Sequence, residues 1–114
     1  MAKLPRPYES FSRAHPEIWR AYDRLGALSH AAGPLNKKTR ELIKLSMAMG
    51  AGLEGAVHSH TRRAVEAGAK PDELRHVVLL AITTLGFPAT MAGLTWVEDE
   101  LGKGSRSRRI RGRR

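Results

Sequence analysis

The chain has 114 residues, which is enough for one domain with a modest core and too few for two ordinary domains. It contains no cysteine, which excludes a disulfide framework, a thiolate metal site and cysteine-based redox chemistry. The formal charge of +9 is unevenly distributed: residues 103–114 carry seven basic and no acidic side chains, whereas residues 1–102 carry 13 basic and 11 acidic ones, a net +2.

The N-terminal part lacks the features of a targeting segment. Residues 1–7 contain two prolines and are not followed by a hydrophobic secretory stretch. No apolar run approaches the roughly 20 residues that span a bilayer. We therefore expect a cytoplasmic protein that begins with an N-terminal arm, residues 1–15, in which residues 8–14 form a short helical turn.

Two helices are predicted in the next part of the chain. Pro16 and Glu17 suit the first turn of a helix over about 16–32, and Gly33-Pro34 ends it. Asn36 is a good N-cap for a helix over about 37–51. The first of these helices is amphipathic, with apolar residues at helical spacing: Ile18, Trp19, Tyr22, Leu25 and Leu28.

Three further helices are predicted after the glycines at 50 and 52. One spans about 53–67, the second begins at Pro71-Asp72-Glu73, and the last covers about 89–101. No segment alternates with period two, so we expect an all-α domain over residues 16–102. The remaining residues, 103–114, are a glycine, serine and arginine segment expected to be disordered. The helix after Pro71 should bury Leu74, Val77, Val78, Ala81 and Ile82.

Two ionisable residues lie within apolar helical stripes. Glu41 shares a side of its helix with Leu45, Ala48 and Met49, and His60 follows Leu53 and Val57 on one face of the next helix. An acid and an imidazole that meet in a partly dry site are a common arrangement for proton transfer. A structural role for the pair, in the core or at a subunit contact, is the alternative.

This stretch resembles the carboxymuconolactone decarboxylase and alkylhydroperoxidase D superfamily. The family pattern has a glutamate, a Cys-x-x-Cys pair at the start of the next helix and a histidine four residues after the second cysteine. Glu41 and His60 match the glutamate and the histidine, while the cysteine positions are occupied by Leu53 and Ala56. The resemblance runs from about Gly33 to Leu101, through GPLNKKTRELIKL and HSHTRRAVEAGAKPDELRHVVLLAITTLGFP.

The resemblance implies an alkylhydroperoxidase D-like helical fold of about five to six helices that assembles as a homo-oligomer, a trimer or a hexamer. It also implies a cofactor-independent decarboxylase that acts on a small carboxylated lactone or a related carbonyl acid. His60 and Glu41 are then the catalytic residues, and Arg40, Arg63 and His58 are candidates for binding the substrate carboxylate. No metal site is predicted, because His58 and His60 diverge on a helix and no third ligand is suitably spaced.

Two other functions are the alternatives to this decarboxylase, and the first of them is disfavoured. Peroxide reduction by a peroxiredoxin-type mechanism would fit the family, but it needs the thiol pair that Leu53 and Ala56 replace. A non-catalytic helical assembly protein would keep the scaffold without turnover. The segment 103–114 is a candidate for weak, salt-sensitive contact with nucleic acid or another acidic surface, although it lacks aromatic residues for base stacking.

Overall fold

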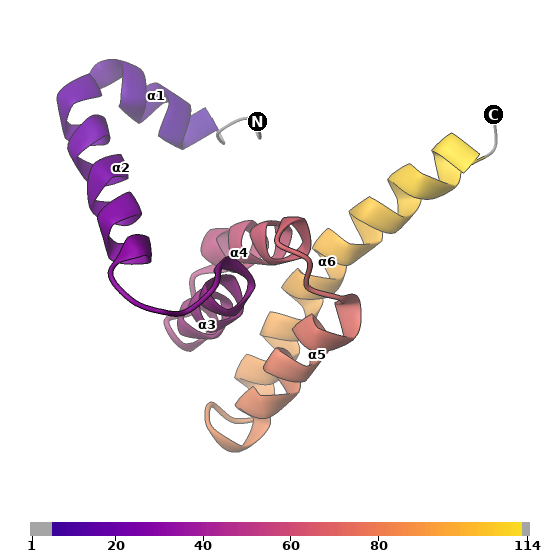
Figure 1. Ribbon diagram of the computed structural model, residues 1–114. Coiled ribbons are helices and arrows are strands. Elements are labelled where there is room, and N and C mark those ends of the chain that lie inside the picture. Colours follow the sequence, from indigo (N-terminus) through magenta and orange to yellow (C-terminus); the bar gives the residue numbers. More distant parts are fainter. Residues whose placement is uncertain (1–5, 113–114) are drawn as a thin grey trace. The chain divides into compact units, whose positions relative to one another are not determined.

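The computed structural model describes residues 6–112, with side chains described as far as Lys103, and this part of the chain is all helical (Figure 1). The predicted all-α fold is therefore confirmed. Within residues 6–112 no helix has both the length and the apolar character needed to cross a membrane. The elements are α1 (Arg6–Ala14), α2 (Pro16–Ala31), α3 (Lys37–Gly50), α4 (Glu54–Glu66), α5 (Pro71–Leu80), the 3-10 helix η1 (Ala81–Thr83) and α6 (Phe87–Gly112).

The chain divides into two compact units, Met1–Pro34 and Leu35–Arg114. The first unit contains α1 and α2, and the second contains α3, α4, α5, η1 and α6. The predicted boundaries of the helical domain, at residues 16 and 102, stay predictions.

Aromatic rings join the two helices of the first unit. The Trp19 ring lies 6.3 Å from Tyr8 and 6.4 Å from Phe11 between ring centroids, so this indole of α2 contacts both rings of α1. Neither helix has a buried residue within the described part of the chain. The apolar stripe predicted for α2 is present but open, because its large side chains are 57% to 65% exposed: Ile18, Tyr22, Leu25 and Leu28.

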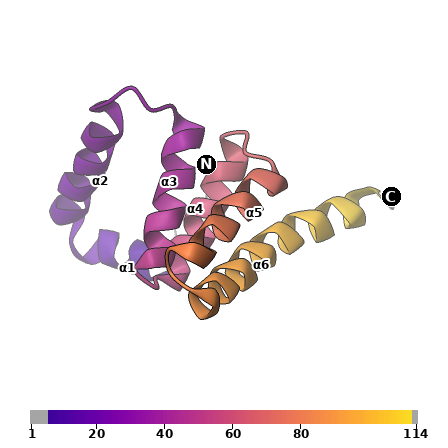
Figure 2. The same ribbon diagram turned by 90° about the horizontal axis from the view of Figure 1, so that it is seen from below.

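The second unit has a compact core between α3, α4, α5 and α6 (Figure 2). The stripe predicted for α3 supplies Leu45, Ala48 and Met49, all buried together with Glu41. This confirms the predicted inner side of α3. The buried apolar residues of the remaining elements are Val57, Ala64, Ala69, Leu74, Val78, Ala81 and Val97.

The ends of α3 and α5 follow from local chemistry. The Asn36 side chain accepts a hydrogen bond of 2.9 Å from the Thr39 N–H, which caps α3 as predicted. After Leu80 the chain tightens into η1, whose three residues per turn shift the angular position of each following side chain. Ile82, predicted to be buried, is 42% exposed for this reason.

Helix α6 is longer than the predicted helix over about 89–101, because it begins at Phe87 and continues to Gly112. Residues 103–114 are predicted from the sequence to be disordered, but the structure has residues 103–112 in α6. Residues 113–114 lie outside the described part. The segment contains no proline, and the high helix propensity of its arginines opposes the low propensity of Gly102 and Gly104.

Gly86 links η1 to α6 with φ = 93°, in the left-handed region that residues with a side chain avoid. We expect Gly86→Ala to lower the free energy of unfolding by about 1–2 kcal/mol, measured by urea denaturation. Gly55→Ala is the matched control, because Gly55 is helical and a Cβ there would meet no atom within 4 Å. This control should be neutral or stabilising by up to about 1 kcal/mol. Equal effects of the two substitutions would contradict the prediction.

Candidate functional site

Helices α3 and α4 bring Glu41 and His60 into direct contact. Nδ1 of His60 lies 2.7 Å from Oε1 of Glu41, although 19 positions separate the residues in sequence. The Glu41 side chain is 3% exposed and the His60 side chain 14% exposed. The predicted convergence of these two groups is therefore present, with the carboxylate inside the unit and the imidazole at its edge.

The direction of this hydrogen bond determines which imidazole nitrogen can exchange a proton. When Glu41 is ionised its oxygens only accept hydrogen bonds, and the matching tautomer has Nδ1–H of His60 donating to Glu41, with Nε2 as the second site of protonation. Nε2 has no hydrogen-bond partner among the described residues. The geometry thus resembles the carboxylate–imidazole half of a catalytic triad, in which the acid orients the ring and stabilises its protonated form.

The two positions that match the family cysteines lie at the start of α4. Leu53 is the N-cap residue and its side chain is 55% exposed, while Ala56 is partly buried. The exposure of Leu53 departs from its predicted place on the buried face. It precedes the helix, directly after Gly52 with φ = 68°, so helical spacing does not apply to it.

The three predicted carboxylate-binding residues have different surroundings. Nη1 of Arg40 donates to the Leu35 carbonyl oxygen at 2.8 Å, and its Nε is buried without a hydrogen-bond partner in the described chain. Arg63 is exposed and makes no ion pair with the residues described. His58 is 2.8 Å from Oε1 of Glu100 through Nδ1. Only Arg63 therefore has a guanidinium that no described neighbour engages.

Glu100 is a second buried carboxylate, and the sequence reasoning missed it. Its Oε1 accepts hydrogen bonds from Nη1 of Arg62 at 2.9 Å and from Nζ of Lys103 at 3.2 Å, in addition to the His58 contact. Its side chain is 5% exposed. The signal in the sequence is the same as for Glu41: Glu100 lies three residues after Val97, on the apolar stripe of its helix.

The surroundings of Glu100 favour its charged form. Burial by itself would raise the pKa of the carboxyl group, but hydrogen bonds from Lys103 and His58 and the positive charge of Arg62 outweigh it and lower the pKa below the ordinary value. This cluster ties α4 to α6, because one oxygen of the Glu100 carboxylate accepts from Arg62 and Lys103 and contacts His58. We therefore interpret the Glu100 cluster as a structural ion cluster that stabilises the packing of α4 against α6.

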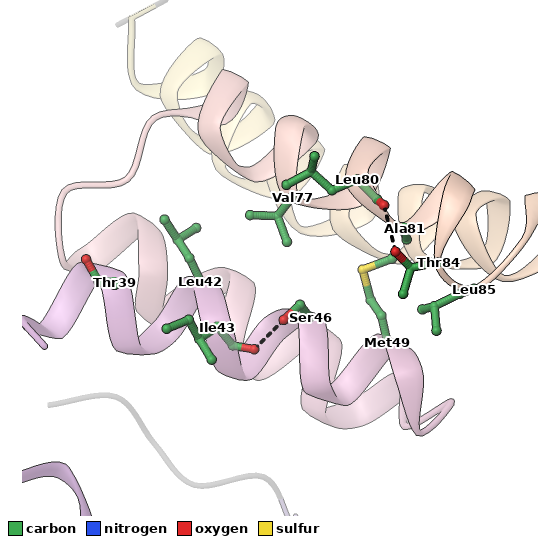
Figure 3. Close-up of a pocket in the computed structure, with 10 residues that line it drawn as sticks. All are labelled: Thr39, Leu42, Ile43, Ser46, Met49, Val77, Leu80, Ala81, Thr84 and Leu85. Carbon is green, nitrogen blue, oxygen red and sulfur yellow. Dashed lines mark hydrogen bonds between the residues drawn. The ribbon is translucent and has the colours of Figure 1, made fainter.

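A cavity of about 420 Å³ lies in the second unit, between α3, α5 and η1 (Figure 3). Its few polar groups are hydroxyls, and those of Ser46 and Thr84 donate to the carbonyl oxygens of Ile43 and Leu80. Neither Glu41 nor His60 lines it. The cavity is therefore separate from the carboxylate–imidazole pair. Its lining residues are Thr39, Leu42, Ile43, Ser46, Met49, Val77, Leu80, Ala81, Thr84 and Leu85.

Within residues 6–103, no three histidine, aspartate or glutamate side chains lie close enough together to hold a metal ion. The acid–base pair Glu41 and His60 lies on the successive helices α3 and α4.

The fold and the Glu–His pair define a helical protein of the carboxymuconolactone decarboxylase and alkylhydroperoxidase D type. The model of the carboxymuconolactone decarboxylase family matches residues 16–99, and the chain belongs to this family. Comparison with the curated proteins gives no match.

Solved structures, including the following two, are similar to the chain. One is the apo form of a carboxymuconolactone decarboxylase family protein from Legionella pneumophila, with 26% identity, a TM-score of 0.73 and coverage of 82% of this chain and 84% of that one. The other is a putative carboxymuconolactone decarboxylase from Burkholderia xenovorans, with 24% identity, a TM-score of 0.70 and coverage of 97% and 85%. At its lower identity the second supports the fold alone.

Proposed function

We propose that the protein is a cofactor-independent lyase that decarboxylates a small carboxylated lactone, or a related carbonyl acid, by proton transfer. The observation that carries the proposal is the 2.7 Å hydrogen bond between Nδ1 of His60 and the buried carboxylate of Glu41. Family membership supports the same class of reaction. In such a pair the partly exposed imidazole can exchange a proton with the substrate. The buried carboxylate orients the imidazole and stabilises its protonated form.

The reaction needs a proton donor after carbon dioxide leaves. Cleavage of the bond between the substrate carbon and its carboxylate leaves the bonding electrons in an enolate conjugated with the lactone carbonyl. Nε2–H of protonated His60 then donates its proton to carbon, which neutralises the enolate. Glu41 stabilises the imidazolium before transfer and keeps the ring oriented, because its oxygen accepts the Nδ1 hydrogen bond throughout.

The substrate carboxylate also needs a cation to orient it. Among Arg40, Arg63 and His58, we assign this role first to Arg63, because its exposed guanidinium makes no ion pair with a described residue. Arg40 and His58 are weaker candidates, since the Leu35 carbonyl and Glu100 already engage them. A single solvent-exposed cation would hold the carboxylate without overstabilising the ground state.

A non-catalytic assembly protein is the second candidate. The observation that favours it is the position of the cavity, which lies between α3, α5 and η1 and is not lined by the acid–base pair. Thiol-dependent peroxide reduction has no such support, because the chain has no cysteine.

Assembly into a homo-oligomer, a trimer or a hexamer, is part of the proposal. The support is the large apolar surface of the described helices, including the α2 stripe and Leu79, Leu80 and Phe87, each about 60% exposed. We expect sedimentation velocity at micromolar concentration to give a species several times the 12.6 kDa chain mass. A compact monomer would contradict this expectation. Location in the cytoplasm likewise stays a prediction.

The test is an assay of the purified protein against a panel of carboxylated γ- and δ-lactones and β-keto acids. Carbon dioxide release is measured by coupled spectrophotometry, and protonation at carbon by NMR of the product formed in D₂O. We expect release and deuterium incorporation for at least one member of the panel, without added metal, thiol or cofactor. Absence of both across the panel, with folded oligomeric protein, would favour the assembly protein.

A further inference from the structure

We propose that the basic segment, residues 103–114, binds double-stranded nucleic acid through its phosphate backbone and without sequence preference. The segment holds seven of the 20 basic residues of the chain and none of its 11 acidic residues. Residues 1–102 have 13 basic and 11 acidic residues, hence a net charge of only +2. The positive charge is therefore concentrated at one end of the chain, where the proposed lyase reaction makes no use of it.

The helical course of this segment gives it a defined form. Helix α6 continues through residues 103–112 to Gly112 (Figure 1). Five basic residues fall within this part of the helix, and successive positions on a helix are separated by about 100°. The five positions are consequently distributed around the axis instead of along one side. The basic residues of the helical part are Lys103, Arg106, Arg108, Arg109 and Arg111.

Basic positions on all sides of the helix axis favour a polyanion over another protein surface as the partner. A helix that packs against protein keeps an apolar stripe, and residues 103–112 contain a single large apolar residue, Ile110. Phosphates of duplex DNA, by contrast, present about one negative charge per 1.7 Å of axis, and a helix of about 10–12 Å diameter fits a major groove about 12 Å wide.

The same composition argues against two other acidic partners. Insertion into a membrane surface needs an apolar face, which one isoleucine does not provide. Single-stranded nucleic acid is held largely by stacking of bases on aromatic side chains, and residues 103–114 include no aromatic residue. Arginine, six of the seven cations here, is well suited to phosphate because its guanidinium donates two parallel hydrogen bonds.

The root of the segment is attached to the folded unit. Nζ of Lys103 donates to Oε1 of Glu100 at 3.2 Å, next to Arg62, which donates to the same oxygen. Glu100 thereby neutralises part of the positive charge at the junction, and the other six basic residues of the segment follow Lys103 in the sequence. A truncation that removes residues 104–114 leaves this junction in place and separates nucleic-acid binding from the stability of the helical unit.

The experiment measures fluorescence anisotropy of a labelled DNA duplex of about 20 base pairs and arbitrary sequence with the full-length protein, between about 50 and 200 mM salt. We expect the logarithm of the binding constant to fall with the logarithm of salt concentration with a slope of about −4 to −6. The variant Arg106→Gln/Arg108→Gln/Arg109→Gln/Arg111→Gln should weaken binding at least about tenfold and reduce the slope by about 3 to 4 units.

The matched control removes four positive charges from exposed positions outside the segment and should leave affinity within about twofold. If the protein without residues 104–114 bound the duplex as tightly as the full-length protein, and with the same dependence on salt, the proposal would be wrong. Stronger binding to anionic vesicles or to single-stranded DNA than to duplex, or equal competition by poly-glutamate, would also overturn it. Lactone decarboxylation by the truncated protein should be unchanged. A negative result in the DNA-binding experiment therefore leaves the lyase proposal intact. The control substitutions are Arg6→Gln, Arg20→Gln, Arg24→Gln and Lys37→Gln.

Discussion

Replacement of His60 by glutamine is expected to lower kcat for lactone decarboxylation by about 10²- to 10⁴-fold, the range associated with loss of a positioned acid or base. Glutamine can hydrogen-bond to Glu41, but its amide cannot carry a proton from Nε2 to a substrate carbon. The measurement is steady-state carbon dioxide release, together with deuterium incorporation at carbon.

The matched control is His76→Gln, the same substitution at an exposed histidine of α5. It should leave kcat within about twofold of the parent. Thermal unfolding of both variants checks that loss of activity is not loss of fold. If His60→Gln kept parental turnover in folded form, the assignment of His60 as the proton donor would be wrong.

Glu41 is distinguished from His60 by the kind of loss it should cause. Glu41→Gln keeps the size of the side chain but removes the charge that stabilises the imidazolium, and it also allows the other imidazole tautomer. We expect a smaller fall in kcat than for His60→Gln, because the imidazole that exchanges the proton with substrate is still present. A purely structural role for Glu41 would lower the free energy of unfolding and leave kcat of the folded variant within about twofold of the parent.

The sequence predicted the part of this site that depends on helical period. Glu41 lies with Leu45 and Ala48 on one side of α3, and all three are buried as expected. The same period, together with the family pattern, placed His60 opposite Glu41, and the two side chains are in contact. Their catalytic roles, and the substrate roles of Arg40, Arg63 and His58, stay predictions.

Other features depended on contacts that periodicity does not encode. The neighbours of Glu100 come from α4 as well as α6, and His58 lies 42 positions away in sequence. Ile82 is exposed because α5 changes to a 3-10 helix after Leu80, which alters the angular spacing. The cavity beside α3 could not be predicted from helical period, because it is lined by side chains of several elements. These elements are α3, α5, η1 and the turn that follows η1.

Glu100→Gln is expected to lower the free energy of unfolding by about 1–3 kcal/mol at pH 7. The substitution removes the charge that holds His58, Arg62 and Lys103, all of which converge on one carboxylate oxygen. Loss of a partner from a fully buried pair costs about 3–5 kcal/mol, but Arg62 and Lys103 are 46% and 66% exposed and can turn toward water. Urea denaturation of parent and variant measures the difference.

The difference between parent and variant should depend on pH in a defined direction. The pKa of Glu100 is lower in the folded protein than its ordinary value of 4.5, so folding favours the ionised carboxylate. Its stabilising contribution is therefore complete above pH 4.5 and is lost as pH falls below 4.5 through the folded-state pKa. Glutamine does not titrate, and the two unfolding curves should approach each other in this acidic range.

Two features of α5 and α6 make the comparison specific to Glu100. Glu73 also has a lowered pKa, through the Lys70 N–H and Lys38, but it is present in both proteins and cancels in the difference. Asp99→Asn removes an exposed carboxylate one residue away and should change stability by less than about 0.5 kcal/mol at every pH. A parent–variant difference that stays constant from neutral pH to well below 4.5 would show that Glu100 stabilises α4 and α6 by packing and not by its charge.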